Sequence, residues 1–214
     1  MVKLSSSEEE NTEFLGTIWN KYRYLIVVGI LVVVAGILGW ESWSKSKASS
    51  AQKVSDLYEN YIGIRESSEE DSSVLASEII ESFPKTLYAD LVTLHLAKLE
   101  VDKNNLVVAT KHLKWVLEKH SSSWQSEFDP IENTARQRLA RVLIADNKPK
   151  EALDLVNAAE FFDQILFEIK GDAENQLGLP EEAKLSYLQA IVSAQSQSIK
   201  ALLRMKLVDL EVKK

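Results

Sequence analysis

The residues best suited to chemistry, the histidines, form no metal-binding or catalytic pattern in this sequence. They are His95, His112 and His120, and the last two are eight residues apart. None lies four residues from another with an acidic neighbour, which is the spacing that places two imidazoles on one helix face around zinc. We therefore expect exposed or capping roles for all three, and no metal site.

The motifs of other enzyme classes are missing too. The sequence contains neither a glycine-rich phosphate loop nor a nucleophile elbow, and its acidic runs are typical of solvated segments. It contains no cysteine, which excludes disulfides and cysteine nucleophiles, and its net charge of −7 leaves no basic field for nucleic acid. We expect a protein that is not an enzyme, uses no cofactor and binds no nucleic acid.

The scarcity of glycine indicates which secondary structure this chain forms. Only Gly63, Gly171 and Gly178 follow residue 40. Tight turns between strands depend on glycine, so a long region with three glycines is unsuited to a sheet. The sequence predicts an all-α fold.

One stretch, "YLIVVGILVVVAGILGWESW" (24–43), carries no charge from Tyr24 to Trp40. As a helix these residues rise roughly 25 Å, the short end of the range that crosses a bilayer. Tryptophans on both sides, Trp19 before and Trp40 and Trp43 after, are typical of the two membrane interfaces. We predict an uncleaved transmembrane anchor over 24–43 in contact with membrane lipid, after a short leader over 1–23.

Two other interpretations of this stretch are weaker. A cleaved signal peptide would need its small-residue exit at Ser49 and Ala51, about ten residues beyond the apolar run. A buried core helix does not fit a run that is apolar all round.

The predicted anchor carries small residues that share a broad face, where another helix could approach closely. They are Gly29, Ala35, Gly36 and Gly39.

The charges beside the run do not decide its orientation. Three basic residues precede it and three follow it within a short distance, a tie under the positive-inside rule. They are Lys3, Lys21 and Arg23 before, and Lys45, Lys47 and Lys53 after. A connecting amphipathic helix over 44–70 comes next, on the 3.6-residue period of its apolar residues, and "RESSEEDSS" then predicts a polar break.

A repeat follows over 71–214. Residues 138–159 match 169–190 at an offset of 31, which pairs Pro149 with Pro180 and Val156 with Tyr187, and 95–116 form a third copy. Small residues recur where two antiparallel helices must close on each other: 97, 140 and 171, then 109, 152 and 183. Asn104, Asn147 and Gly178 stand at the turns and tolerate a left-handed conformation.

These positions resemble the tetratricopeptide repeat, best in Gly171, Gly178, Ala183, Tyr187 and Ala190. Its aromatic fourth position is matched by Phe167, whereas Thr93 and Arg136 replace it in the other copies. We expect a degenerate hairpin over 54–82 before these copies. The stretch "EKHSSSWQSEFDP" predicts a loop that ends in an Asp129–Pro130 helix start, and "SIKALLRMKLVDLEVKK" predicts a capping helix.

A repeat array of this kind has a concave face formed by its first helices. The repeat register predicts the positions that face inward on that surface and could bind a peptide or partner protein. They are Leu94, Lys98, Val101, Gln137, Arg141, Ile144, Glu168, Asp172 and Asn175. The set is chemically mixed and lacks the cluster of lysines and asparagines with which some tetratricopeptide domains clamp a carboxy-terminal carboxylate.

Longer stretches resemble the YfgM-type ancillary subunit of the bacterial SecYEG translocon: "FLGTIWNKYRY", "GWESW", "LYADLVTLHLAKLEVDKNNL" and "RLARVLIADNKPKEAL". The resemblance implies an inner-membrane protein with a cytoplasmic amino terminus and a periplasmic repeat domain. The partners it implies are the translocon, a membrane-anchored periplasmic prolyl-isomerase-like chaperone, and emerging secretory chains handed over to chaperones.

Two alternatives remain open. The tie in flanking charge permits a repeat receptor that faces the cytosol. A periplasmic scaffold for envelope assembly, which never meets secreted chains, has the same sequence features.

Overall fold

The computed structural model describes residues 6–121 and 128–212, in which every regular element is an α-helix. Side chains are described within these ranges except at residues 6–23, 26, 30, 41–46, 48, 69 and 212. The helices are α1 (Ser6–Ile64), α2 (Glu69–Ser82), α3 (Leu87–Asp102), α4 (Leu106–Ser121), α5 (Pro130–Ala145), α6 (Pro149–Asn157), α7 (Gln164–Gln176), α8 (Pro180–Ser193) and α9 (Gln197–Val212). The predicted all-α fold is confirmed for these residues.

The chain divides into two units, Met1–Asp56 and Leu57–Lys214. In the first unit, the described large apolar side chains of the run from Tyr24 to Trp40 are exposed, with Leu31 and Leu38 each 61% accessible. A Cβ added at Gly29, Gly36 or Gly39 would meet no atom within 4 Å. Among the residues with a described placement, no helix has an apolar stretch long enough to cross a membrane. The side chains of the predicted leader over 1–23 lie outside the described set.

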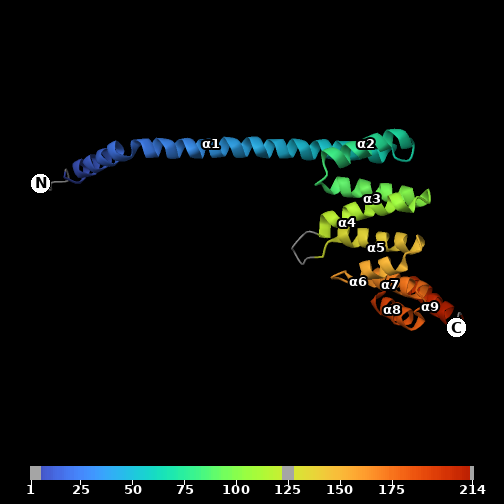
Figure 1. Cartoon of the computed structure of the whole chain (residues 1–214). Coiled ribbons are helices and arrows are strands. Elements are labelled where there is room, and N and C mark those ends of the chain that lie inside the picture. Colours follow the sequence, from blue (N-terminus) through green and yellow to red (C-terminus); the bar gives the residue numbers. More distant parts are fainter. Residues whose placement is uncertain (1–5, 122–127, 213–214) are drawn as a thin grey trace. The chain divides into compact units, whose positions relative to one another are not determined.

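The second unit is an array of helical hairpins (Figure 1). Helices α3 and α4, α5 and α6, and α7 and α8 pack as consecutive pairs, and α9 packs on α8. The first helices also contact one another, α3 with α5 and α5 with α7. This is the predicted tetratricopeptide-like solenoid, and α9 follows the last pair at the place expected for a capping helix.

The turns form where the sequence predicts them. Asn104 and Asn147 have φ of 59° and 58°, and Gly178 has φ of 76°. Left-handed backbone of this kind disfavours most L residues but is accessible to asparagine and glycine. Pro149 and Pro180 begin α6 and α8, where a missing backbone N–H costs little.

The repeated small residues lie at the centre of the core. Ala97, Ala109, Ala140 and Ala152 are all nearly inaccessible. The closest approach is at Gly171, where a Cβ would lie 2.5 Å from Cε1 of Tyr187. Only glycine admits the tyrosine ring at this position, which explains the one departure from alanine in the series.

Two element boundaries differ from the expectation. The polar break is shorter than "RESSEEDSS", because Ser68 accepts a hydrogen bond from the Asp71 N–H and starts α2 at once. Helix α4 continues to Ser121, so the first residues of the predicted loop "EKHSSSWQSEFDP" are helical. Residues 122–127 of that loop lie outside the described chain.

Candidate binding face

The first helices of the three hairpins carry the predicted inward-facing positions. Their side chains differ widely in accessibility. Lys98, Val101 and Arg141 are exposed; Gln137, Ile144, Glu168, Asp172 and Asn175 are partly buried; and Leu94 is 4% exposed. Leu94 belongs to the hydrophobic core with Ala97 and Leu139, so its side chain does not reach the surface. The accessible part of the set therefore lies mainly on α3 and α5.

Gln137 holds two repeats together. Its amide Nε2 donates to Oδ2 of Asp163 at 2.8 Å, and Nδ2 of Asn133 donates to the same oxygen at 2.9 Å. The other carboxylate oxygen of Asp163 accepts the N–H of Leu166 at 2.9 Å and so caps α7. One aspartate thus fixes both the start of α7 and its distance from α5.

Glu168 and Asp172 are engaged by the capping helix. Lys206 of α9 donates to Oε1 of Glu168 at 2.8 Å and to the two oxygens of Asp172 at 2.7 and 2.8 Å. Tyr187 of α8 donates its hydroxyl to Oδ1 of Asp172 at 2.8 Å, and the Lys206 ammonium lies 5.6 Å from the tyrosine ring centroid. Three helices therefore meet at this charge cluster.

The charges of the cluster shift its titration in a consistent way. Burial lowers the pKa of Lys206, but its hydrogen bonds to Asp172 and Glu168 outweigh burial and leave that pKa raised. Burial, reinforced by the neighbouring Asp172 carboxylate, raises the pKa of Tyr187 far above its ordinary value. The lysine is therefore charged and the tyrosine neutral at physiological pH, so the ion pairs of Lys206 with Glu168 and Asp172 persist there.

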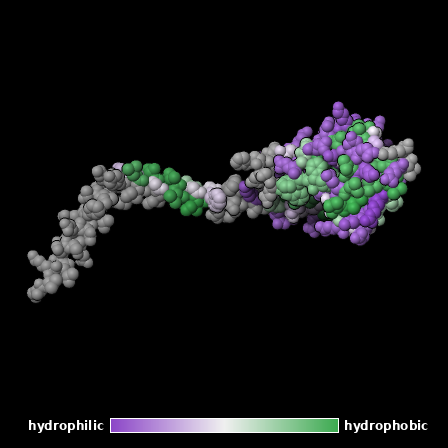
Figure 2. Space-filling model, turned by 90° about the horizontal axis from the view of Figure 1, so that it is seen from below, coloured by the Kyte–Doolittle hydropathy of each residue, from purple (hydrophilic) through white to green (hydrophobic). Residues whose placement is uncertain are grey.

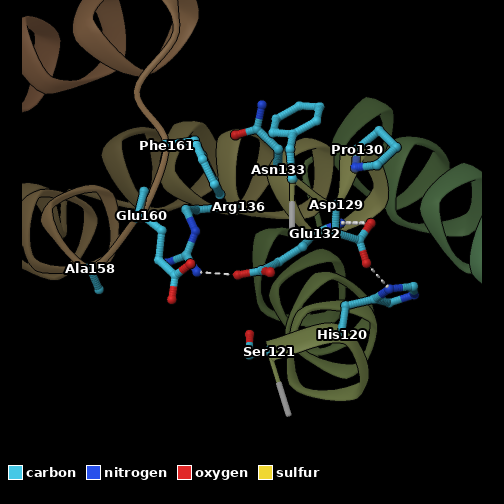
Figure 3. Close-up of a pocket in the computed structure, with 12 residues that line it drawn as sticks. His120, Ser121, Asp129, Pro130, Glu132, Asn133, Arg136, Ala158, Glu160 and Phe161 are labelled. Atoms are coloured by element: carbon cyan, nitrogen blue, oxygen red, sulfur yellow. Dashed lines mark hydrogen bonds and ion pairs between the residues drawn. The ribbon is translucent and has the colours of Figure 1, made fainter. Parts of the chain in front are cut away.

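A pocket that the sequence did not predict lies where the end of α4, the start of α5 and the α6–α7 connection meet (Figure 3). Its volume is about 390 Å³. His120 at its edge faces two carboxylates: Nδ1 lies 2.6 Å from Oδ2 of Asp129, and Nε2 lies 3.1 Å from Oδ2 of Asp90. Lys119 also donates to Asp90, at 2.7 Å, and Asp90 is 2% exposed.

Arg136 forms another wall of this pocket. Its guanidinium pairs with Glu132 and donates to the Leu155 carbonyl at 2.9 Å, so all its visible contacts are internal. Arg136 stands where the repeat pattern has an aromatic, and its hydrogen bond to the Leu155 carbonyl links α5 to α6. At the rim, Phe128 and Phe161 meet edge to face with centroids 6.0 Å apart.

The histidines are structural rather than exposed. His95 Nδ1 lies 2.5 Å from the Tyr61 hydroxyl, and burial, with Arg65 and Lys98 nearby, lowers the pKa of His95. A neutral imidazole and the Tyr61 hydroxyl therefore share this hydrogen bond. Burial also lowers the pKa of His112. Within the described residues no group of histidine and acidic side chains is arranged to hold a metal ion.

One part of the His120 cluster is predictable from the sequence, the Asp129–Pro130 helix start. Asp129 caps α5 as predicted, accepting the N–H groups of Ile131 and Glu132. Burial raises the pKa of Asp129, but the bonds from His120 and from these two N–H groups outweigh burial and leave it lowered. Nothing in the sequence places Asp90 beside His120, because 30 residues separate them.

Three relatives are similar to this chain along most of its length, and each is named "Ancillary SecYEG translocon subunit". The one from Neisseria gonorrhoeae is 28% identical over 95% of this chain and 97% of its own. The one from Escherichia coli is 23% identical over 99% and 100%, and that from Aggregatibacter actinomycetemcomitans 25% over 86% and 88%. The expected resemblance to ancillary translocon subunits is confirmed.

A family model agrees with the hairpin array described above. The model is that of the tetratricopeptide repeat-like domain, and it matches residues 17–212. The match extends from before the apolar run to the end of α9 and includes every hairpin. This chain belongs to the tetratricopeptide repeat-like domain family.

Proposed function

We propose that this protein is a membrane-anchored, non-enzymatic ancillary subunit of the SecYEG translocon. Its amino terminus is cytoplasmic and its repeat domain periplasmic. The domain associates with the translocon and with a membrane-anchored prolyl-isomerase-like chaperone, and it helps to pass emerging chains to periplasmic chaperones. The observation that carries this proposal is the similarity to three ancillary translocon subunits across both units of the chain.

The apolar run supports an anchor over 24–43. Its described apolar side chains point away from any core, with Val32 65% and Val33 60% exposed. Leaving such side chains in water costs roughly 25 cal/mol for each Å² of apolar surface. A lipid environment removes that cost for the whole run, and Gly29, Ala35, Gly36 and Gly39 then offer a face for close contact with translocon helices.

The face on α3 and α5 supports an adaptor role. Lys98, Val101 and Arg141 combine two cations with one apolar side chain, all accessible to solvent. A shallow, mixed surface of this kind suits weak contacts with varied chains. Asp172 and Glu168 contribute less to it because Lys206 already holds them.

Topology is tested with a reporter that is active only in the periplasm, fused to the carboxy terminus. We expect activity, and we expect the chain to remain with membranes after alkaline extraction. A variant with Val32→Lys and Val33→Lys should lose both, because two charges at the centre of the run oppose insertion. A reporter active only in the cytosol would overturn the proposed orientation.

Partners are tested by photo-crosslinking in cells from Lys98 and Arg141. We expect adducts with translocon subunits and, after a short pulse label, with newly made secretory chains. Lys150 on α6 is a matched control, since it is also an exposed lysine but lies on a second helix. If the two positions trap only stable assembly proteins, or if Lys150 gives the same adducts, the hand-over proposal fails.

A further inference from the structure

The outer surface of α9 is more apolar than the end of a repeat array should be. Leu202, Met205 and Val208 are 48%, 64% and 57% exposed. The last helix of a solenoid usually carries a polar outer face, because its inner face alone covers the core. In α9 that inner face is present as well: Leu203 and Leu210 are buried with Tyr187. The helix is therefore apolar on two opposite sides.

Helix α8 also exposes apolar side chains. Leu185, Leu188 and Val192 are 64%, 42% and 83% exposed at helical spacing, on a helix that packs against α9. Figure 2, which views the array from this end, shows hydrophobic side chains gathered between hydrophilic ones. Each of these six residues is between 42% and 83% exposed, so both terminal helices keep large apolar side chains in contact with solvent.

The residues of α9 follow a heptad on this outer side. Ala201 and Val208 fall at d and Met205 at a, so the apolar seam has the spacing of a paired helix. Arg204 then falls at g and Asp209 at e of the next heptad. Opposite charges five residues apart at g and e are the pairs that join two parallel helices.

These two charges are available for such a pair. Both side chains are exposed, and neither forms an ion pair with another side chain in the described part of the chain. By contrast, Lys206 on the opposite side of α9 is held by Glu168 and Asp172. Arg204 and Asp209 stand on the two flanks of the Met205 seam, so a second α9 in parallel would meet each with its opposite.

We propose that the α8–α9 end is a self-association surface, and that its occupant is a second copy of this chain. The two copies pair in parallel about a two-fold axis along α9. Met205 and Val208 form the seam, and Arg204 of each copy meets Asp209 of the other. The seam is short and buries less than the roughly 800 Å² that each partner contributes to a standard interface, so we expect a weak dimer. This property lies beyond the proposed adaptor function and does not depend on it.

The first test measures the dissociation constant of the full chain in a non-ionic detergent, by sedimentation equilibrium at matched solvent density. We expect a dimer for the unaltered chain and a loss of affinity of about a hundredfold for Met205→Glu, which places two charges in the seam. Circular dichroism checks that this exposed substitution leaves the fold intact. A monomeric unaltered chain, or a dimer that Met205→Glu does not weaken, would overturn the proposal.

The second test exchanges the two charges and does not depend on the seam. Arg204→Asp and Asp209→Arg should each weaken the dimer about tenfold, because each converts two attractive pairs into repulsive ones. The double variant should recover the original constant, and a mixture of the two single variants should form mixed dimers in preference to either homodimer. Recovery in the mixture excludes misfolding as the cause. Single variants that pair as well as the unaltered chain, or a mixture without preference, would contradict the parallel arrangement.

Discussion

The hairpins α5–α6 and α7–α8 fill the same repeat positions in opposite ways. In α5–α6 the positions hold Ala140 and Val156, and in α7–α8 they hold Gly171 and Tyr187. All four are buried, so each hairpin closes fully, one with a small and a medium-sized residue and the other with the smallest and one of the largest. What the repeat preserves is the summed volume between its helices, and either helix can supply that volume.

The difference also decides how each hairpin joins its neighbour. The ring of Tyr187 ends in a hydroxyl that reaches Asp172, and through it the Lys206 of α9. Val156 has no polar group, and its hairpin joins α7 through Gln137, Asn133 and Asp163 instead. A glycine at position 171 thus permits both a tight core and an ionic contact to the next helix.

The largest loss of stability should come from truncating Tyr187 or Val156, the larger residue of each pair. We expect Tyr187→Ala to destabilise the repeat domain by about 3–5 kcal/mol, from the lost burial and the cavity it leaves. Val156→Ala should cost clearly less, because fewer buried atoms are removed. Urea unfolding followed by circular dichroism measures both, and equal losses would contradict the idea that the hairpins fill their cores differently.

A smaller effect should follow from adding a methyl group at Gly171. Gly171→Ala places a Cβ against a buried ring that cannot turn aside, and we expect a loss of about 1–3 kcal/mol despite the better helix propensity of alanine. Adding Tyr187→Val to that variant copies the other hairpin and should restore most of the core packing. A double variant no more stable than Gly171→Ala would show that the two positions are not coupled.

Removing the charge of Lys206, which joins α9 to α7, should lower the stability by a similar or smaller amount. Lys206→Met keeps the aliphatic stem but leaves Glu168 and Asp172 facing each other without a cation, at an expected cost of about 1–2 kcal/mol. Hydrogen exchange should show the loss first in α9. Lys200 on the same helix is partly buried and provides the control, since Lys200→Met should leave exchange in α9 unchanged.

The smallest effect concerns Asp129, the aspartate that starts α5. The pKa of Asp129 is below its ordinary value of 3.8, so the unfolded chain binds the proton more tightly. The stability that ionised Asp129 contributes is therefore complete above pH 3.8. It is lost as the pH falls through the lower pKa that Asp129 has in the folded protein. Asp129→Asn keeps the cap and removes the charge, so the variant should differ from the parent by about 0.5–1 kcal/mol at pH 6 and converge with it near pH 2. Melting curves across this pH range would contradict the prediction if the difference stayed constant.

The sequence predicted most of the array because its signals are local. The turn asparagines, the prolines at the start of α6 and α8, and the small residues at 97, 140 and 171 each determine backbone or packing within one hairpin. The contacts of Lys206 with Glu168 and Asp172 and of His120 with Asp90 join residues about 30 or more positions apart. Periodicity assigns such residues to a face but not to a partner.

The predicted binding face shows the same limit. The repeat register placed Leu94, Lys98 and Val101 on one side of α3, yet Leu94 is in the core and Lys98 at the surface. A small rotation of a helix between its neighbours moves one residue from groove to core, and the sequence does not determine that rotation. Arg136 departs from the repeat pattern, but the sequence does not predict its contacts with Glu132 and Leu155.

The order of helix contacts has a consequence for how the domain forms. Each helix from α2 to α9 packs mainly against the next one in the chain, and the longest-range helix pairs are only two elements apart. Chains dominated by such local contacts close short loops and fold quickly. A hairpin can therefore assemble as soon as both its helices are available, before later residues have arrived. A domain built this way can fold progressively from α2 toward α9, before the later helices are available.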